Sequence, residues 1–153
     1  MTGIPMGTLR GLQTSLAFFL SNVVGTAFSY EIIFTVQNIR NNQGYLMAAL
    51  HNQSNTFPGK GGALIYIKAQ AKKGVMKQKF LVETPGNYAI SIFHDENNNG
   101  VLDKNLLGIP TEGYGFSNTA EPDFKKAVLH VNKETTEVTI DLKYPYNPPK
   151  NQK

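Results

Sequence analysis

The sequence predicts an all-β protein: a single antiparallel β-sandwich of about seven strands, immunoglobulin-like or transthyretin-like, with a long loop between the fifth and sixth strands. Three observations lead to this fold class. Apolar and polar residues alternate in one short segment after another, and Gly, Pro and Asn cluster between these segments. No segment after residue 29 keeps a helical period. Cysteine and tryptophan are absent, which excludes the Cys-Trp-Cys core of antibody domains, so the prediction concerns architecture alone.

The first two predicted strands are residues 30–37 and 45–50, joined by an Asn- and Gly-containing turn at 41–44. Because strand side chains alternate between two faces, the first strand has one strongly apolar face. Its members are Tyr30, Ile32, Phe34 and Val36. A polar stretch with Pro58 and several glycines then ends the second strand.

The third and fourth predicted strands, residues 63–69 and 75–82, form a hairpin around a turn at 72–74. Residues 68–79 hold five lysines and no acidic residue. Such a surface could dock anionic glycans or lipid head groups. Lysines also protect an exposed sheet edge from aggregation, and we favour that second interpretation.

The fifth predicted strand is residues 88–92, and the last pair is 127–131 and 138–142. His94 has the same strand parity as Ile90 and Ile92, so we expect it to point inward and to hydrogen-bond the following loop. Between the fifth and sixth strands, residues 95–123 carry little strand signal, and a connector of this length in a compact domain is usually functional or disordered.

Three regions are expected along the chain: a secretory signal peptide at 1–29, the sandwich domain at 30–145 and a disordered tail at 146–153. The leader has Arg10, an apolar centre at 16–24 and small residues near Ser29. A membrane anchor is the alternative, but polar residues interrupt the apolar segment. We therefore expect export to the periplasm or the cell exterior, with no membrane span after cleavage.

Composition excludes several classes of function. With no cysteine, the chain has no disulfide, thiolate metal site or cysteine nucleophile. The net charge of +4 is too small to indicate a nucleic-acid partner. Nothing in the sequence indicates an oligomeric state.

The start of the long connector has the spacing of a calcium-binding loop. If Asp95 takes position 1, the ligand positions that follow are filled by Asn97, Asn99, the Val101 carbonyl and Asp103. Ca²⁺ is a hard cation that prefers oxygen ligands. Gly100 stands at the sharp turn, where a glycine gives the chain the backbone freedom to wrap around an ion.

The twelfth position of this loop is Leu106, so the usual bidentate carboxylate is missing. Glu112 is the best candidate to replace it, and Glu96 and Asp123 are weaker ones. We expect a weak structural calcium site, with a dissociation constant of about 10⁻⁴ to 10⁻³ M. The alternative is a turn rich in Asn, Asp and Gly that binds no metal.

The rest of the connector is too apolar for disorder. We expect it to fold back on the sandwich, with Tyr114 and Phe116 forming either a ligand-binding platform for a sugar or another flat ligand, or buried anchors. The expected partner is a glycan or another envelope component.

The same connector resembles a bacterial family of exported proteins, domain-of-unknown-function family 2141. The residues that carry the resemblance are Phe93-His94-Asp95-Glu96-Asn97, Asn99-Gly100, Leu102-Asp103, Leu107-Gly108-Ile109-Pro110, Glu112-Gly113-Tyr114-Gly115-Phe116-Ser117-Asn118, Pro122 and Phe124. The resemblance implies a secreted or periplasmic β-sandwich and supplies no activity or catalytic residue.

Two classes of function fit these observations. A calcium-stabilised binding or structural module of the cell envelope is the favoured one, with no catalytic residue assigned. The alternative is an envelope hydrolase that uses the Glu112 loop. A serine hydrolase built on His94 and Ser117 would need the two side chains in contact, and the sequence gives no indication of that.

Overall fold

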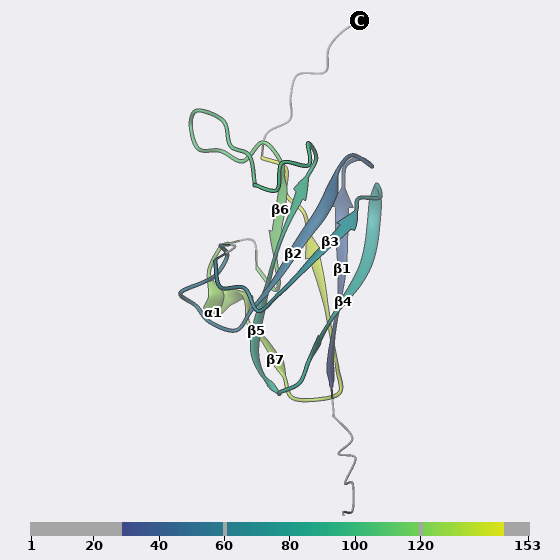
Figure 1. The fold of residues 1–153 in the computed structure, drawn as a ribbon, viewed down its shortest axis with the longest axis vertical. Coiled ribbons are helices and arrows are strands. Elements are labelled where there is room, and N and C mark those ends of the chain that lie inside the picture. Colours follow the sequence, from purple (N-terminus) through teal and green to yellow (C-terminus); the bar gives the residue numbers. More distant parts are fainter. Residues whose placement is uncertain (1–28, 60, 120, 146–153) are drawn as a thin grey trace, which may run out of the picture.

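Two β-sheets pack face to face in the computed structural model, which describes residues 29–59, 61–119 and 121–145 (Figure 1). The predicted all-β sandwich is confirmed. The predicted signal peptide, apart from Ser29, and the predicted tail at 146–153 lie outside the described residues.

The smaller sheet has the order β4-β1-β8. Its strands are β1 (Tyr30–Ile39), β4 (Gly74–Val82) and β8 (Thr135–Asp141). β1 pairs antiparallel with β4 but parallel with β8, so the prediction of a wholly antiparallel sandwich is wrong at this pair. Alternation of apolar residues fixes which side chains face the core and does not encode strand direction.

The larger sheet has the order β3-β2-β5-β6, and β7 also pairs with β5. Its strands are β2 (Tyr45–His51), β3 (Ile65–Gln70), β5 (Gly86–Asp95), β6 (Gly113–Phe116) and β7 (Leu129–Val131). A single helical turn, α1 (Phe124–Ala127), precedes β7, and Asp123 caps it by accepting a hydrogen bond from the Lys125 amide. None of the described helical structure is long and apolar enough to cross a membrane.

The predicted long loop is shorter than expected, because its second part forms β6. Tyr114 and Phe116 lie in this strand, which pairs with residues 91–94 of β5. Only residues 96–112 are left as the connection, named here the β5–β6 loop. β6 has only four residues, and two of them are glycine. Such a short segment does not show a period of two in the sequence.

The core between the sheets is built from the alternating positions that the sequence predicts. It includes Ile32, Phe34 and Val36 of β1 and Ile90 and Ile92 of β5. Phe34 stacks on the ring of Phe80, with 5.0 Å between ring centroids.

A second, smaller apolar cluster covers the outer face of β5. Its buried members are Ala89, Phe116 and Ala127, and Phe57, Tyr114 and Phe124 pack against them. Phe57 comes from the β2–β3 loop, described at residues 52–59 and 61–64. β5 is therefore buried on both faces. The β2–β3 loop, β6 and α1 contribute the residues that cover its outer face.

Candidate functional site

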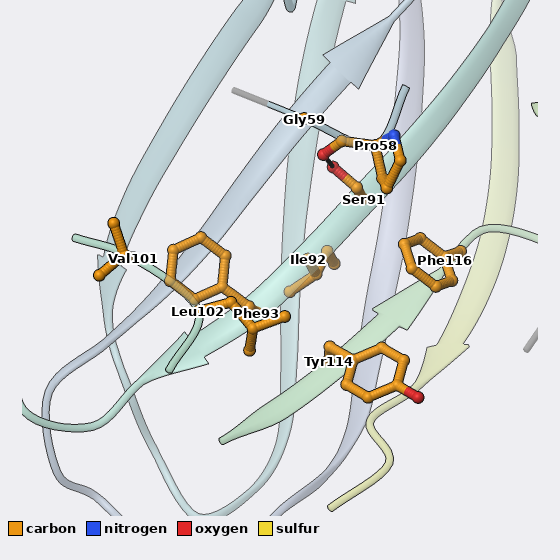
Figure 2. A pocket seen from close by; sticks show the side chains of 9 residues that line it. All are labelled: Pro58, Gly59, Ser91, Ile92, Phe93, Val101, Leu102, Tyr114 and Phe116. Atoms are coloured by element: carbon orange, nitrogen blue, oxygen red, sulfur yellow. Dashed lines mark hydrogen bonds between the residues drawn. The ribbon is translucent and has the colours of Figure 1, made fainter. Parts of the chain in front are cut away.

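The candidate site lies on the outer face of the larger sheet, where β5 and β6 run side by side (Figure 2). Ile90, Ile92 and His94 of β5 point toward the sandwich core, so the residues between them point outward. Ser91 and Phe93 therefore face outward, toward the β2–β3 and β5–β6 loops. Tyr114 is paired with Phe93 across the strands, which brings the two aromatic residues next to each other.

A cavity of about 250 Å³ opens between the two loops on this face. The β2–β3 loop contributes Pro58 and Gly59 to its wall, and the β5–β6 loop contributes Val101 and Leu102. The strands contribute Ser91, Ile92, Phe93, Tyr114 and Phe116. Figure 2 shows the rings of Phe93, Tyr114 and Phe116 spread around the two strands. The lining is almost entirely apolar, which is typical of small-molecule sites.

Two lining side chains carry a hydroxyl, Ser91 and Tyr114, and the Ser91 hydroxyl is held by hydrogen bonds. Its Oγ lies 3.1 Å from Nε2 of His51 and 3.3 Å from the Pro58 carbonyl oxygen, to which it donates. Because Ser91 donates to Pro58, His51 Nε2 is the donor to Ser91. On the other side of the ring, Nδ1 lies 3.5 Å from Oγ1 of Thr56. This arrangement connects β2, β5 and the β2–β3 loop below the cavity.

His51 is buried completely, and burial lowers the pKa of its imidazole below the ordinary value of 6.5. A charged imidazole would lose its hydration here without gaining a carboxylate partner from the hydrogen bonds described above. His51 therefore acts as a neutral hydrogen-bonding group. The ring of Phe57 meets it edge to face at 5.3 Å between centroids.

The β5–β6 loop is organised by carboxylates. Asp95 is fully buried at the end of β5, and its two oxygens accept hydrogen bonds from the amides of Asn99 at 3.0 Å and Gly100 at 2.8 Å. The expected backbone turn at Gly100 is confirmed, since its φ is 77°. One side chain thus closes the first turn of the loop.

Asp103 closes the next turn. Its carboxylate accepts hydrogen bonds from the side-chain amides of Asn97 at 2.6 Å and of Asn99 at 2.9 and 3.0 Å. The amide oxygens of the same two residues accept backbone hydrogen bonds from Asn99 and Val101. Hydrogen bonds therefore join Asn97, Asn99 and Asp103, three of the residues that the sequence singled out.

Glu112 joins both ends of this loop. Its Oε1 accepts from the Glu96 amide at 2.8 Å, and its Oε2 accepts from the Asp103 amide at 3.1 Å. The side chain is buried, and this burial raises the pKa of Glu112, with the nearby charges of Asp103 and Asp95 adding to the rise. The sequence prediction that Glu112 reaches back to the Asp95 loop agrees with this geometry. The hydrolase prediction would need this carboxylate to contact a substrate, whereas here it is buried and accepts two backbone amides.

Arg40, at the end of β1, holds the base of the loop. Its guanidinium forms a two-pronged ion pair with Glu96, and it lies 4.4 Å above the ring of Tyr144. Burial opposes ionisation of Glu96, but the hydrogen bonds from Arg40 and Asn41 outweigh it and lower the pKa of Glu96. The sequence pattern did not predict that Arg40 would pair with Glu96.

His94 is fully buried and points inward, as expected. Its partners differ from the expected ones: Nε2 donates to the Gln43 carbonyl at 2.7 Å, and Nδ1 lies 2.8 Å from the Tyr144 hydroxyl. These groups belong to the β1–β2 turn and to the segment after β8, not to the β5–β6 loop. Ser117 is engaged elsewhere, since its Oγ donates to the Ala127 carbonyl and accepts from the Ile90 amide.

The donor atoms around the β5–β6 loop are of the kind that Ca²⁺ prefers: carboxylate, amide and carbonyl oxygens. In the described part of the chain, no three His, Cys, Asp or Glu side chains form a group that could hold a metal ion. The carboxylates of Asp95 and Glu112 accept backbone amides, and that of Asp103 accepts side-chain amides. Each carboxylate oxygen keeps lone pairs beyond these bonds.

Sequence reasoning identified Tyr114 and Phe116 but missed Pro58, Ser91 and Phe93, which share the cavity with them. The strand parity of β5 could have placed Ser91 and Phe93 together on one face. The contribution of Pro58 had no sequence signal, because the β2–β3 loop is far away along the chain.

A family model described as "Uncharacterized protein conserved in bacteria (DUF2141)" matches residues 34–139. The chain belongs to this family. No curated protein and no solved structure matches the chain.

Proposed function

We propose that this member of the DUF2141 family is an exported binding module of the cell envelope, which holds an apolar group of its ligand in the cavity between the β2–β3 and β5–β6 loops. The observation that carries this proposal is the cavity, lined by Phe93, Tyr114 and Phe116. The rings of Phe93 and Tyr114 are half-buried at this opening, so an apolar ligand group that entered the cavity would cover their remaining exposed surface.

The lining favours an apolar ligand group over a sugar. A sugar needs several hydrogen-bonding partners beside an aromatic platform, whereas the side chains that line this cavity supply only the hydroxyls of Ser91 and Tyr114, and that of Ser91 already bonds to Pro58 and His51. The ligand class is therefore a small aromatic or branched aliphatic group with few polar contacts. The envelope component that presents this group would be apolar or amphipathic.

A fluorescent probe tests this proposal. The neutral dye N-phenylnaphthylamine brightens in apolar surroundings, and the chain has no tryptophan to interfere. Saturable brightening is expected with the unmodified chain. Val101→Phe fills the cavity wall and should weaken dye binding about tenfold or more, as expected for a lost contact of about 1.4 kcal/mol.

The matched control is Val75→Phe. Val75 is 60% exposed and Val101 is 51% exposed, but Val75 lies on β4, away from the cavity. Dye binding that Val101→Phe and Val75→Phe change equally, or that never saturates, would show that the cavity is not the binding site.

Calcium is the second part of the proposal: Ca²⁺ stabilises the β5–β6 loop by binding among Asp95, Asn97, Asn99, the Val101 carbonyl, Asp103 and Glu112. The supporting observation is the crowding of negative charge, since Asp95 and Asp103 both oppose ionisation of Glu112. A cation would relieve this repulsion. Val101 and Leu102 line the cavity. A cation that fixes the β5–β6 loop would therefore also fix one wall of the binding site.

Thermal unfolding in calcium and in magnesium tests this part. Calcium at about ten times its dissociation constant should add about 1.4 kcal/mol to the free energy of unfolding. Asp103→Asn should abolish the calcium effect, whereas Asp141→Asn, an exposed carboxylate on β8, should preserve it. An unchanged melting temperature in calcium would overturn the calcium proposal and leave the cavity proposal standing.

Export rests on the leader, and a separate experiment tests it. Expressed with its leader in a bacterial host, the chain should be found outside the cytoplasm with a new N-terminus near Ser29. An intact N-terminus on cytoplasmic material would contradict export.

A further inference from the structure

The tip of the β5–β6 loop exposes three large apolar side chains. Leu106 is fully exposed, Leu107 is 82% exposed and Ile109 is 41% exposed. The β5–β6 loop that carries them projects from one end of the sandwich (Figure 1). The cavity does not include them. Leucines this exposed on a protruding tip are unfavourable in water unless a partner covers them.

The tip is closed by its own hydrogen bonds. The Asn105 side-chain oxygen accepts from the amides of Leu107 and Ile109, both at 3.0 Å. The Gly108 amide donates to the Asn105 carbonyl, and the Asn105 amide donates to the Ile109 carbonyl, both at 2.9 Å. Pro110, which has no amide hydrogen, closes the tip by pairing with Lys104. These bonds satisfy the amides of Asn105, Leu107, Gly108 and Ile109, which lowers the cost of moving the tip out of water.

Three exposed lysines lie at the same end of the molecule as the tip. The carboxylates of the β5–β6 loop lie there too, but Asp95 and Glu112 are buried, Asp103 is half-buried and Glu96 pairs with Arg40, so the lysines dominate the exposed charge. Lys104 lies at the base of the tip, and Lys72 and Lys73 lie in the β3–β4 turn. The register of the strands places this turn beside the end of β1 and the β5–β6 loop at the end of β5, which is the same end of the sandwich (Figure 1). Among the described residues, no carboxylate is within ion-pair distance of these three lysines.

From these observations we propose that this end of the molecule docks on an anionic lipid surface. Leu106, Leu107 and Ile109 enter between the head groups, and the lysines contact the lipid phosphates. The exposed lysines favour an anionic surface, since basic side chains are attracted to anionic lipid head groups. The narrow tip suits insertion among lipids, because it exposes three large apolar side chains within four residues.

Single tryptophans test the insertion directly. Leu106→Trp introduces the only tryptophan in the chain, and Leu81→Trp places one at the opposite end, where β4 pairs with the start of β1. Vesicles of equimolar phosphatidylcholine and phosphatidylglycerol, with and without brominated acyl chains, are added to the full chain. The emission of Leu106→Trp should shift to shorter wavelength and be quenched by bromine, and the emission of Leu81→Trp should do neither.

This pair of variants also separates loop docking from any attachment through the leader. Residue 81 lies next to the start of β1, so a vesicle held by the leader alone would be nearer to position 81 than to position 106. Equal quenching of both variants, or quenching of Leu81→Trp alone, would overturn the proposal.

Charge and apolar contacts are tested separately by vesicle sedimentation. Lys72→Glu/Lys73→Glu should weaken binding to the anionic vesicles about tenfold or more, and Lys133→Glu, at the opposite end, should not. Leu106→Ser/Leu107→Ser should weaken it at least as much, unlike Leu81→Ser. Unchanged binding of the two double variants, or self-association that Leu106→Ser/Leu107→Ser abolishes in the absence of vesicle binding, would overturn lipid docking.

Discussion

The two loops that border the cavity are held in different ways. The β2–β3 loop is fixed by aromatic packing: the ring of Phe57 lies 5.3 Å from His51, 5.5 Å from Phe116 and 5.8 Å from Phe124. The β5–β6 loop is fixed by carboxylates, with Asp95 and Glu112 each accepting two backbone amides. Burial of aromatic rings holds the β2–β3 loop in place, and hydrogen bonds to buried carboxylates hold the β5–β6 loop in place.

This difference teaches where the cavity is sensitive to conditions. Aromatic packing responds weakly to pH and ions, whereas carboxylate hydrogen bonds respond to protonation and to cations. Because Pro58 and Val101 stand on opposite walls, the cavity has one wall of each kind. Ligand binding should then depend on cations through the β5–β6 wall, while the other wall responds to pH only through His51.

The largest expected effect comes from the carboxylate-held loop. Glu112→Ala leaves the amides of Glu96 and Asp103 without their acceptor, and each such loss costs about 1 to 3 kcal/mol. We expect urea unfolding to show a loss of about 3 kcal/mol. Glu121→Ala, an exposed carboxylate that pairs with Lys126, is the matched control and should cost less than about 1 kcal/mol. Similar costs for both variants would contradict the role of Glu112.

Removal of the aromatic anchor should have a smaller effect. Phe57 is half-buried, so Phe57→Ala should lower the free energy of unfolding by about 2 kcal/mol, less than for a fully buried ring. Phe57→Leu, which keeps an apolar side chain, should restore most of it. Hydrogen exchange should quicken in the β2–β3 loop and stay unchanged in residues 96–112. Faster exchange in both loops would show that they are not held independently.

The smallest effect concerns pH and the histidine below the β2–β3 loop. The pKa of His51 is lowered in the folded chain, so between 6.5 and this lower value the unfolded chain binds a proton that the folded chain does not. The free energy of unfolding should therefore fall as pH drops below about 6.5 and be independent of His51 at higher pH. His51→Gln should flatten this part of the stability profile. An identical slope in both proteins would contradict the effect of burial.

The sequence was sufficient for the features that depend on local pattern. Alternation identified the core face of β1 and β5, and the Asp-Asn-Gly spacing identified a turn in which Asp95, Asp103 and Glu112 act together. Each of these follows from side-chain parity or from the preference of one residue for one backbone conformation. The sandwich itself follows from several such strands.

Features that join distant segments were not predictable in this way. The cavity needs Pro58, Val101 and Phe116 from three separate parts of the chain, and the parallel pairing of β1 with β8 depends on the path between the sheets. β6 stayed hidden because its glycines give no apolar alternation. Gly113 and Gly115 are needed there for close approach, since a Cβ would lie 2.3 Å from the Tyr144 ring or 2.9 Å from the Asp141 carbonyl oxygen.

The central claim is that the cavity between the two loops receives an apolar ligand group. Amide NMR spectra during titration with N-phenylnaphthylamine test it most directly. The account predicts saturable shifts for Ser91, Phe93, Tyr114 and Phe116, together with Gly59 and Val101 on the two walls. Shifts confined to the β4-β1-β8 sheet or to the Leu106 tip, with the cavity residues unchanged, would contradict it.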